Sequence, residues 1–264
     1  MSGNRERGSG MCPFFRTFPR RHLKKGGDCG IMWAEEKRGM ALQYRHEWKT
    51  EISAADKILL AQRLDALLQR DPHVDENGCY HIRSLYFDNL SDTALREKID
   101  GLAHRKKFRL RYYNGDISRI LLEQKCKDNS LGYKLSAPIT APEVQRILDG
   151  DWEWLLSAAH PLLRSLGEKM LHEGYLPRTI VDYTREPFIY EAGNVRVTLD
   201  YDIRTGLWNT DFLDRNSVTI PASDACLLEV KYDNYLPEVV RAAVQLGQRR
   251  VGAFSKYAAS RMWD

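Results

Sequence analysis

The sequence lacks the features that mark secreted, zinc-binding and membrane-spanning proteins. Its five cysteines are odd in number and widely spaced with no CxxC pair, so neither a disulfide framework nor a zinc site is indicated. The seven histidines show no ligand spacing either. No apolar run is long enough to span a bilayer, and the N-terminus has no apolar stretch of the kind that a secretory signal carries. We therefore expect free thiols, a cytoplasmic location and no membrane insertion by this chain.

Length and charge set only broad limits. The 264 residues, 43% of them hydrophobic, suffice for one large domain or two small ones. The net charge of +4 is a mild excess. Such an excess points to an anionic ligand only if the positive charge gathers on one face or inside one cleft.

The first 40 residues differ from the rest of the chain. They are rich in glycine and arginine and show no apolar periodicity, so we predict that residues 1–40 are disordered or a non-native extension. Met40, which directly precedes the first strand pattern, is a plausible true start. A basic arm that binds nucleic acid is the alternative. Residues 41–264 are then the single functional domain.

Residues 41–264 predict antiparallel strands with a few helices. A capping box from Ser53 to Asp56 opens one helix, and Asn114-Gly115 predicts a β-hairpin. The fold class is therefore α+β and mainly antiparallel β, and a closed barrel decorated with helices would leave no exposed strand edge. Strands are predicted at 44–52, 80–87, 108–113, 120–126, 179–183, 188–191, 195–201 and 227–232. Helices are predicted at 53–70, 91–101, 142–148, 152–172 with a break at Pro161, and 237–246.

Charged residues recur at alternate positions of the predicted strands. Arg109 and Arg111 share one strand face because side chains two apart point the same way, as do Glu123, Lys125 and Lys127. An acid-x-base form recurs in three strands, at Glu47-x-Lys49, Glu123-x-Lys125 and Glu229-x-Lys231.

Two interpretations of this pattern stay open. The charged faces either point into a barrel and hold a polyanion, with carboxylates that bind a divalent metal, or they form a solvated or RNA-facing basic surface. In the second case Arg109 and Arg111 would join His104, Arg105, Lys106 and Lys107. Lys106 and Lys107 themselves are expected at a turn surface.

Seven ordered blocks resemble a known family. They are IRSLYFDN (82–89), ALREKIDG (94–101), KFRLRYYN (107–114), LLEQKCK (121–127), VRVTLDYDIR (195–204), LLEVKYDNYLP (227–237) and FSKY (254–257). From about residue 43 onward the chain resembles the VTC-type polyphosphate polymerase domains of the CYTH-like triphosphate tunnel superfamily. The resemblance implies an eight-stranded triphosphate-tunnel β-barrel whose interior binds triphosphate or polyphosphate.

The resemblance also implies site residues. Arg109 and Arg111 match the pair that grips phosphate and, with Lys256, are the expected catalytic residues. Glu229 matches the metal-binding glutamate, and Glu123 and Glu47 are further candidate ligands for Mn²⁺ or Mg²⁺. Ala253 stands where family members often carry another base. The expected phosphate-binding residues are Lys49, Lys125, Lys134, Arg185, Arg196, Lys231 and Ser255.

The activity that the resemblance implies is transfer of the terminal phosphate of ATP to a growing polyphosphate chain. The expected partners are ATP and inorganic polyphosphate, with no nucleic acid, and a membrane or regulatory partner is left open. A CYTH-type triphosphatase and a non-catalytic polyphosphate-binding module are the alternatives. Arg45 replaces the first acid of the CYTH E-x-E-x-K signature, which favours the polymerase over the hydrolase.

Overall fold

A computed structural model describes residues 45–128, 131–247, 252 and 254–262, and the chain divides into residues 1–42 and Gln43–Asp264. The prediction for residues 1–40 lies outside the described residues. No helix in the described part is long and apolar enough to cross a membrane.

The strands are β1 (His46–Ile52), β2 (Gln69–Arg70), β3 (Tyr80–Asp88), β4 (His104–Tyr113), β5 (Ile120–Asp128), β6 (Leu131–Ile139), β7 (Leu176–Tyr190), β8 (Val195–Thr205), β9 (Ile220–Ser223) and β10 (Cys226–Tyr232). The helices are α2 (Ala54–Leu67), α3 (Thr93–Ile99), α4 (Ala141–Leu148), the 3-10 helix η1 (Glu153–Ser157), α5 (Pro161–Glu173), α6 (Glu238–Val244) and α7 (Lys256–Ser260).

The strands of Gln43–Asp264 form one sheet that curls round on itself. Eight of them follow the order β1-β10-β8-β7-β3-β4-β5-β6, and β2 and β9 extend it at β7 and β8. Every neighbouring pair is antiparallel. One antiparallel bridge between Arg45, just before β1, and Gly132 in β6 joins the two ends of the path. This arrangement confirms the predicted tunnel-like α+β fold.

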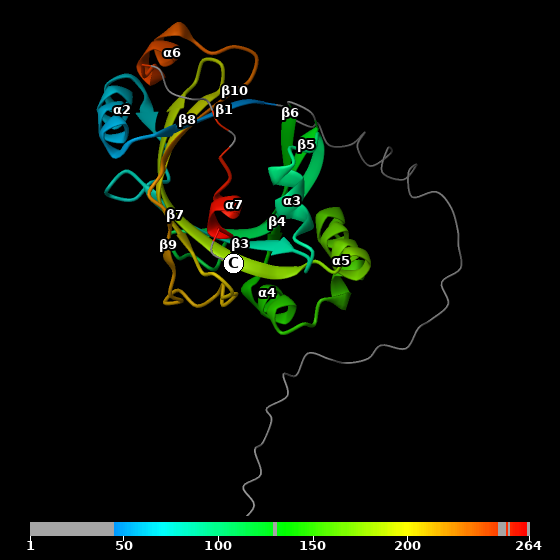
Figure 1. Cartoon of the computed structure of the whole chain (residues 1–264). Coiled ribbons are helices and arrows are strands. Elements are labelled where there is room, and N and C mark those ends of the chain that lie inside the picture. The colour runs from blue at the N-terminus through cyan, green and yellow to red at the C-terminus, as the bar shows by residue number, and fades with distance from the viewer. Residues whose placement is uncertain (1–44, 129–130, 248–251, 253, 263–264) are drawn as a thin grey trace, which may run out of the picture. The chain divides into compact units, whose positions relative to one another are not determined.

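Helices lie along the outside of the curled sheet (Figure 1), and apolar side chains of the outer sheet face pack against them. On one side, Val197, Leu228 and Val230 meet Leu60 of α2 and Val240 of α6. On the other side, a second core joins the outward residues of β3, β4 and β5 to α4, η1 and α5, with Phe108, Leu110, Leu122, Val144 and Leu166 among its members. Because strand side chains alternate, burying this outer face turns the intervening charged positions inward.

Local sequence signals account for several element boundaries. The Ser53 side chain accepts the Asp56 N–H at 3.1 Å, and the Asp56 side chain accepts the Ser53 N–H, so the predicted capping box opens α2. Asn114 and Gly115 both have positive φ in the turn between β4 and β5, as the hairpin prediction required.

Two strand predictions were incomplete. β6, which contains Gly132 and Pro138, was not predicted, because both residue types disfavour strands. Pro138 fits because β6 pairs along its length with β5 alone. β7 is one strand rather than two. On one side Pro187 lies opposite Thr198 of β8, and on the other it falls between the stretches that pair with β3 and β2, so the ladder on that side does not need its missing N–H.

Asp88 ties the C-terminal helix to the barrel. Its buried carboxylate accepts the backbone N–H groups of Ala94 (2.9 Å) and Leu95 (3.1 Å) at the start of α3. It also accepts the Tyr257 hydroxyl of α7 at 2.7 Å. Tyr257 in turn stacks on Tyr86, with ring centroids 4.9 Å apart. One carboxylate therefore positions α7, which lies within the curve of the sheet in Figure 1.

We predict that Asp88→Ala lowers the free energy of unfolding by about 3 kcal/mol, because it leaves a buried hydroxyl and two N–H groups without an acceptor. Chemical denaturation followed by circular dichroism measures the change. The matched control Asp224→Ala removes an exposed carboxylate and should change stability by less than about 0.5 kcal/mol. Equal stability of the two variants would contradict the anchoring role.

Candidate functional site

The inner face of the curled sheet lines a cavity of about 470 Å³. Among the described residues, its lining has eleven Lys or Arg side chains and only two carboxylates. The charged strand faces thus point inward, as the first of the two interpretations of the alternation predicts. The basic residues are Lys49, Lys98, Arg105, Lys107, Arg109, Arg111, Lys125, Lys127, Arg185, Lys231 and Lys256, and the acids are Glu47 and Glu229.

Arg109 and Arg111 of β4 form the first charged group of the wall. Arg109 donates to Glu123 through Nε and Nη2, both at 2.7 Å, and to the Tyr86 hydroxyl at 3.1 Å. Arg111 donates to Ser84 Oγ at 3.1 Å and to the Tyr183 hydroxyl at 2.8 Å. Burial disfavours the charge on Arg109, yet Glu123 raises its pKa well above the usual value. These bonds use fewer than the five N–H groups of each guanidinium, so donors remain for an anion.

Asp200 organises the second group. It is fully buried and accepts Arg185 Nε at 2.6 Å, Arg185 Nη2 at 2.8 Å and Lys256 Nζ at 2.5 Å. Burial opposes its ionisation, but Arg185 and Lys256 hold the pKa of Asp200 at about 2. Asp200 thus fixes a strand arginine and the α7 lysine on the same wall.

The third group joins β1, β5 and β10. Lys49 Nζ lies 3.2 Å from Glu47 Oε1 and 3.3 Å from Glu229 Oε2. Lys125 donates to both oxygens of Glu47, at 3.0 and 3.2 Å, and Lys231 pairs with Glu229. Burial opposes ionisation of Glu229, yet Lys231 and Lys49 hold its pKa well below the usual value. Three ammonium groups therefore share two carboxylates.

Glu47 and Glu229 fit a divalent metal. One ammonium group, that of Lys49, contacts both carboxylates. Burial and the charge of Glu229 oppose ionisation of Glu47, yet Lys49 and Lys125 hold its pKa below the usual value, so the two carboxylates are both charged and repel each other. Carboxylate oxygens are ligands that Mg²⁺ and Mn²⁺ accept, and a divalent cation would relieve that repulsion. Glu123 differs, because it is 1% exposed and both of its oxygens bond to cations, Arg109 and Lys134. Its metal role stays a prediction.

The structure brings ten of the thirteen predicted site residues to the cavity. The other three are Glu123, Lys134 and Arg196. Lys134 Nζ donates to Glu123 at 2.5 Å, and neither residue is among those that line the cavity. Arg196 Nη2 donates to the Tyr80 hydroxyl at 2.6 Å and pairs with Asp71 at 3.0 Å. The ten that line the cavity are Glu47, Lys49, Arg109, Arg111, Lys125, Arg185, Glu229, Lys231, Ser255 and Lys256.

Several lining residues were not predicted. β4 begins at His104, four residues before the predicted strand, and this places Arg105 and Lys107 on the same face as Arg109. The prediction of a turn surface is therefore wrong for Lys107, although Lys106 is exposed as expected. Alternation along β4 was the signal that could have found them.

Tyrosine hydroxyls complete the wall beside the arginines. Tyr86 and Tyr183, which accept from Arg109 and Arg111, both line the cavity. Burial opposes ionisation of Tyr86, but Arg109 and Arg111 lower its pKa to about 8. Tyr183 also carries the Lys256 ammonium 4.4 Å from its ring centroid. No sequence pattern paired these tyrosines with the arginines.

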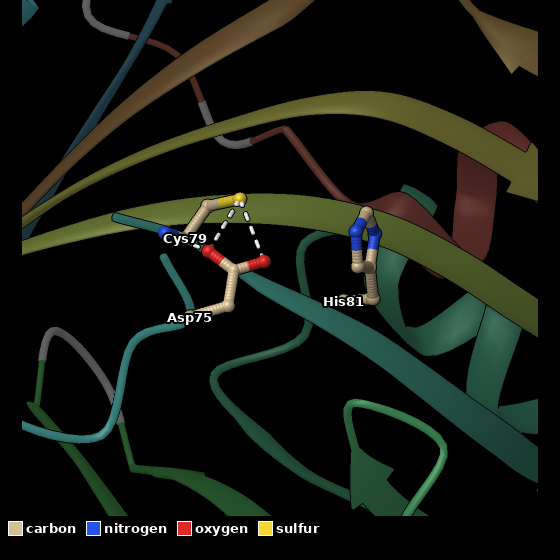
Figure 2. A group of neighbouring side chains, drawn as sticks. All are labelled: Asp75, Cys79 and His81. Carbon is tan, nitrogen blue, oxygen red and sulfur yellow. Dashed lines mark hydrogen bonds between the residues drawn. The ribbon is translucent and has the colours of Figure 1, made fainter. Parts of the chain in front are cut away.

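Asp75, Cys79 and His81 form a separate group that does not line this cavity (Figure 2). Their donor atoms lie within 4.8 Å of one another, a spacing that a metal could use. The Asp75 carboxylate, however, accepts the Asn77 and Cys79 N–H groups at 2.9 and 3.0 Å, and the Cys79 thiol lies 3.5 Å from it. Burial and then Asp75 raise the pKa of Cys79 to about 11, so the thiol stays protonated. These contacts close the turn before β3, and this explains why the three residues lie together.

Comparison with known proteins finds one matching family and several solved structures of low sequence identity. The chain is similar to a provisional adenylate cyclase from Bacillus halodurans, with 13% identity, a TM-score of 0.40, and coverage of 73% of this chain and 82% of that one. It is also similar to the capping enzyme triphosphatase of Mimivirus, with 8% identity, a TM-score of 0.35, and coverage of 81% and 90%. At these values the likenesses carry no argument about activity, and no curated protein matches. The VTC domain profile, in contrast, matches residues 44–262. Because this match spans well over half of the sequence, the protein belongs to the VTC domain family.

Proposed function

We propose that this VTC domain protein is a polyphosphate polymerase, which transfers the terminal phosphate of ATP to a growing chain of inorganic polyphosphate. The observation that carries the proposal is the charge of the cavity, where eleven basic side chains meet two carboxylates among the described residues. Like charges confined together need a counter-charge, and a linear polyanion supplies one along its whole length. Family membership and the seven sequence blocks support the same substrate class.

The arginines have the geometry for phosphate. Guanidinium groups present planar N–H forks that match phosphate oxygens, whereas lysines act as point charges. Arg109 and Arg111 are fixed by Glu123, Tyr86 and Ser84, so they would meet the transferred phosphoryl group with little reorganisation. Arg185 and Lys256, both held by Asp200, would neutralise further charge beside them, since Tyr183 contacts both Arg111 and Lys256.

The reaction needs no covalent intermediate with the protein. An oxygen at the end of the polyphosphate chain bonds to the γ-phosphorus of ATP, the bond from that phosphorus to the β–γ bridging oxygen breaks, and ADP leaves with the electron pair. Negative charge moves from the attacking oxygen to the bridging oxygen, and positioned cations lower the barrier by stabilising it there. A Mn²⁺ or Mg²⁺ ion held by Glu47 and Glu229 would supply further neutralisation of the phosphate oxygens.

Arg45 supports the polymerase over the triphosphatase. It stands where the CYTH hydrolase signature has an acid, and its Nε pairs with Asp233 at 2.9 Å. The cavity therefore has one acid fewer for metal than that signature provides. ATP as donor and the free thiols of Cys79, Cys126 and Cys226 suit a cytoplasmic location.

We expect the protein to convert ATP with Mn²⁺ into long polyphosphate with little free phosphate. Gel staining and a phosphate assay on the same tube measure both products. Arg109→Ala/Arg111→Ala should lower polymer yield at least about 100-fold, because it removes two preorganised donors to the transition state.

Arg119→Ala is the matched control for this assay, since Arg119 is an exposed arginine of the β4–β5 connection. It should retain wild-type yield. Free phosphate without polymer would contradict the polymerase and indicate a triphosphatase. Absence of both products, with tripolyphosphate still bound, would indicate a binding module.

We predict that Glu229→Gln lowers turnover about 100-fold and weakens Mn²⁺ binding in the presence of tripolyphosphate, because a carboxylate ligand is lost. Electron paramagnetic resonance of Mn²⁺ reports binding independently of turnover. Glu51→Gln, an exposed glutamate of the same β1–β10 ladder, is the control and should leave both unchanged. Unaltered Mn²⁺ binding in Glu229→Gln would exclude Glu229 as a ligand.

Affinity for tripolyphosphate should fall as the pH rises from 7 to 9. Burial, and then Lys49, lower the pKa of Lys125 to about 7, and burial lowers that of Lys107 to about 8. Both lysines attract an anion only when protonated, so binding is strongest below these pKa values and weakens as the pH rises through them. Calorimetric titration at a series of pH values measures the fall. Lys125→Arg keeps its charge and should flatten the profile, and an unchanged profile in this variant would rule out Lys125 as a source.

A further inference from the structure

A second cavity lies against the outer face of the sheet, between β3, β7, β8 and the loop that joins β8 to β9. Its volume of about 310 Å³ is near the lower end of the range of ligand pockets, which runs from about 300 to 1,000 Å³. Among the described residues, Tyr183 alone lines both this cavity and the inner one. The outer cavity is therefore a separate place on the molecule, with room for a small ligand.

A row of outward side chains forms the floor of this cavity. Tyr112 of β4 lies opposite Arg83 of β3, and Arg83 lies opposite Asp182 of β7. Asp182 in turn lies opposite Arg204 of β8. Residues directly opposite each other in a ladder share a face, and Tyr112 belongs to the same outer core as Leu110. The whole row thus faces away from the inner cavity.

Arg83 anchors the β8–β9 loop over this row. Its Nε and Nη2 donate to the two oxygens of Asp182, at 2.9 and 2.8 Å. Nη1 donates to the Asp214 carbonyl at 2.6 Å, and Nη2 also donates to the Ser217 carbonyl at 3.2 Å. Burial opposes the charge on Arg83, but its bonds to Asp182 raise its pKa above the usual value. Arg83 and Asp182 therefore neutralise each other, and Arg83 has little left to offer a ligand.

Arg204 and His81 present further donor atoms to the cavity. Arg204 donates to Thr219 Oγ1 through Nε at 3.2 Å and to the Thr219 carbonyl through Nη2 at 2.6 Å, which leaves Nη1. Asp202 lies 3.5 Å from Nη1, but its side chain is 57% exposed, so water screens this pair. The His81 ring contacts Thr184 Oγ1 at 3.3 Å through Nδ1, which leaves Nε2.

Arg215 is the third cation of the cavity and stands on the anchored loop. In the described part of the chain, no hydrogen bond or ion pair engages its guanidinium. Its Cδ lies 3.7 Å from the place that a Cβ of Gly115 would occupy, so the stem packs against the β4–β5 turn. The Asp116 carboxylate of that turn instead accepts the Ser118 hydroxyl at 2.6 Å and the Ser118 N–H at 3.0 Å.

The protein does not balance the charge of this cavity. With Asp182 matched by Arg83, the lining leaves Arg204 and Arg215 against one exposed carboxylate, that of Asp202. A single exposed arginine is ordinary surface. Two that line one walled cavity from different segments, one of them on a loop fixed by a buried ion pair, form a site that an anion would complete.

We propose that this outer cavity is a binding site for a small free phosphate anion, held by Arg204, Arg215 and His81. Guanidinium forks match phosphate oxygens, and an imidazole beside them can donate a further hydrogen bond. Two arginines suit a single phosphate rather than a polymer with a charge on every unit. The inference goes beyond the proposed function and does not depend on it, because the site lies outside the inner cavity.

NMR titration of the full chain with orthophosphate, followed at the imidazole ring signals, tests the site. The His81 signal, assigned with His81→Gln, reports on the outer cavity because His81 does not line the inner one. We expect it to shift and saturate. In Arg204→Ala/Arg215→Ala the affinity reported by this signal should fall at least about tenfold, because two charged donors are lost. Calorimetric affinity for tripolyphosphate, which reports on the inner site, should stay within about twofold.

Arg63→Ala/Arg241→Ala is the matched control, since it removes the same charge from exposed positions of α2 and α6. It should keep the wild-type response of His81. Arg215→Ala alone separates binding from folding, because its melting temperature should equal that of the wild type while phosphate affinity falls. A His81 signal that phosphate does not move, that moves equally in Arg204→Ala/Arg215→Ala, or that responds more strongly to acetate would overturn the outer site. The polymerase assay is unaffected by any of these results.

Discussion

Positive charge in a confined interior is unfavourable unless anions lie close to it, and the rest of the structure depends on this constraint. The buried acids each hold more than one cation. Glu123 bonds Arg109 and Lys134, Asp200 bonds Arg185 and Lys256, and Glu229 pairs with Lys49 and Lys231. The inner wall is thereby stable enough to fold without ligand.

The sheet supplies these charges because its outer face is apolar. Phe108 and Leu110 pack under α4 and α5, while Arg109 between them faces the cavity. On the other wall, Leu228 and Val230 pack under α2 and α6, while Glu229 faces inward. Burial of the outer residues therefore stabilises the orientation of the inner ones. Asp88 positions α7 in a similar way, because its bond to Tyr257 holds the helix that carries Lys256.

The ion pairs of the ligand-free site also suit the proposed chemistry. Lys49, Lys125 and Lys231 are bound to Glu47 and Glu229, the two carboxylates that fit a divalent metal. A metal on these carboxylates would release the lysines to phosphate oxygens. Metal and polyanion would then support each other, since each neutralises the groups that the other sets free. Lys125, whose pKa is already depressed to about 7, would gain the most from a phosphate neighbour.

The sequence by itself determined local structure and which residues of a strand share a face. The capping box at Ser53, the hairpin at Asn114-Gly115 and the shared face of Arg109 and Arg111 follow from short-range chemistry, and the seven ordered blocks pointed to the family. Tertiary structure alone decided that the charged faces point inward, because a period of two separates two faces without saying which is enclosed. It also decided that Arg196 bonds Tyr80 and Asp71, and that Lys134 bonds Glu123. Those contacts, like the place of β6 beside Arg45, join residues that no local pattern relates, since they depend on how the sheet curls and closes.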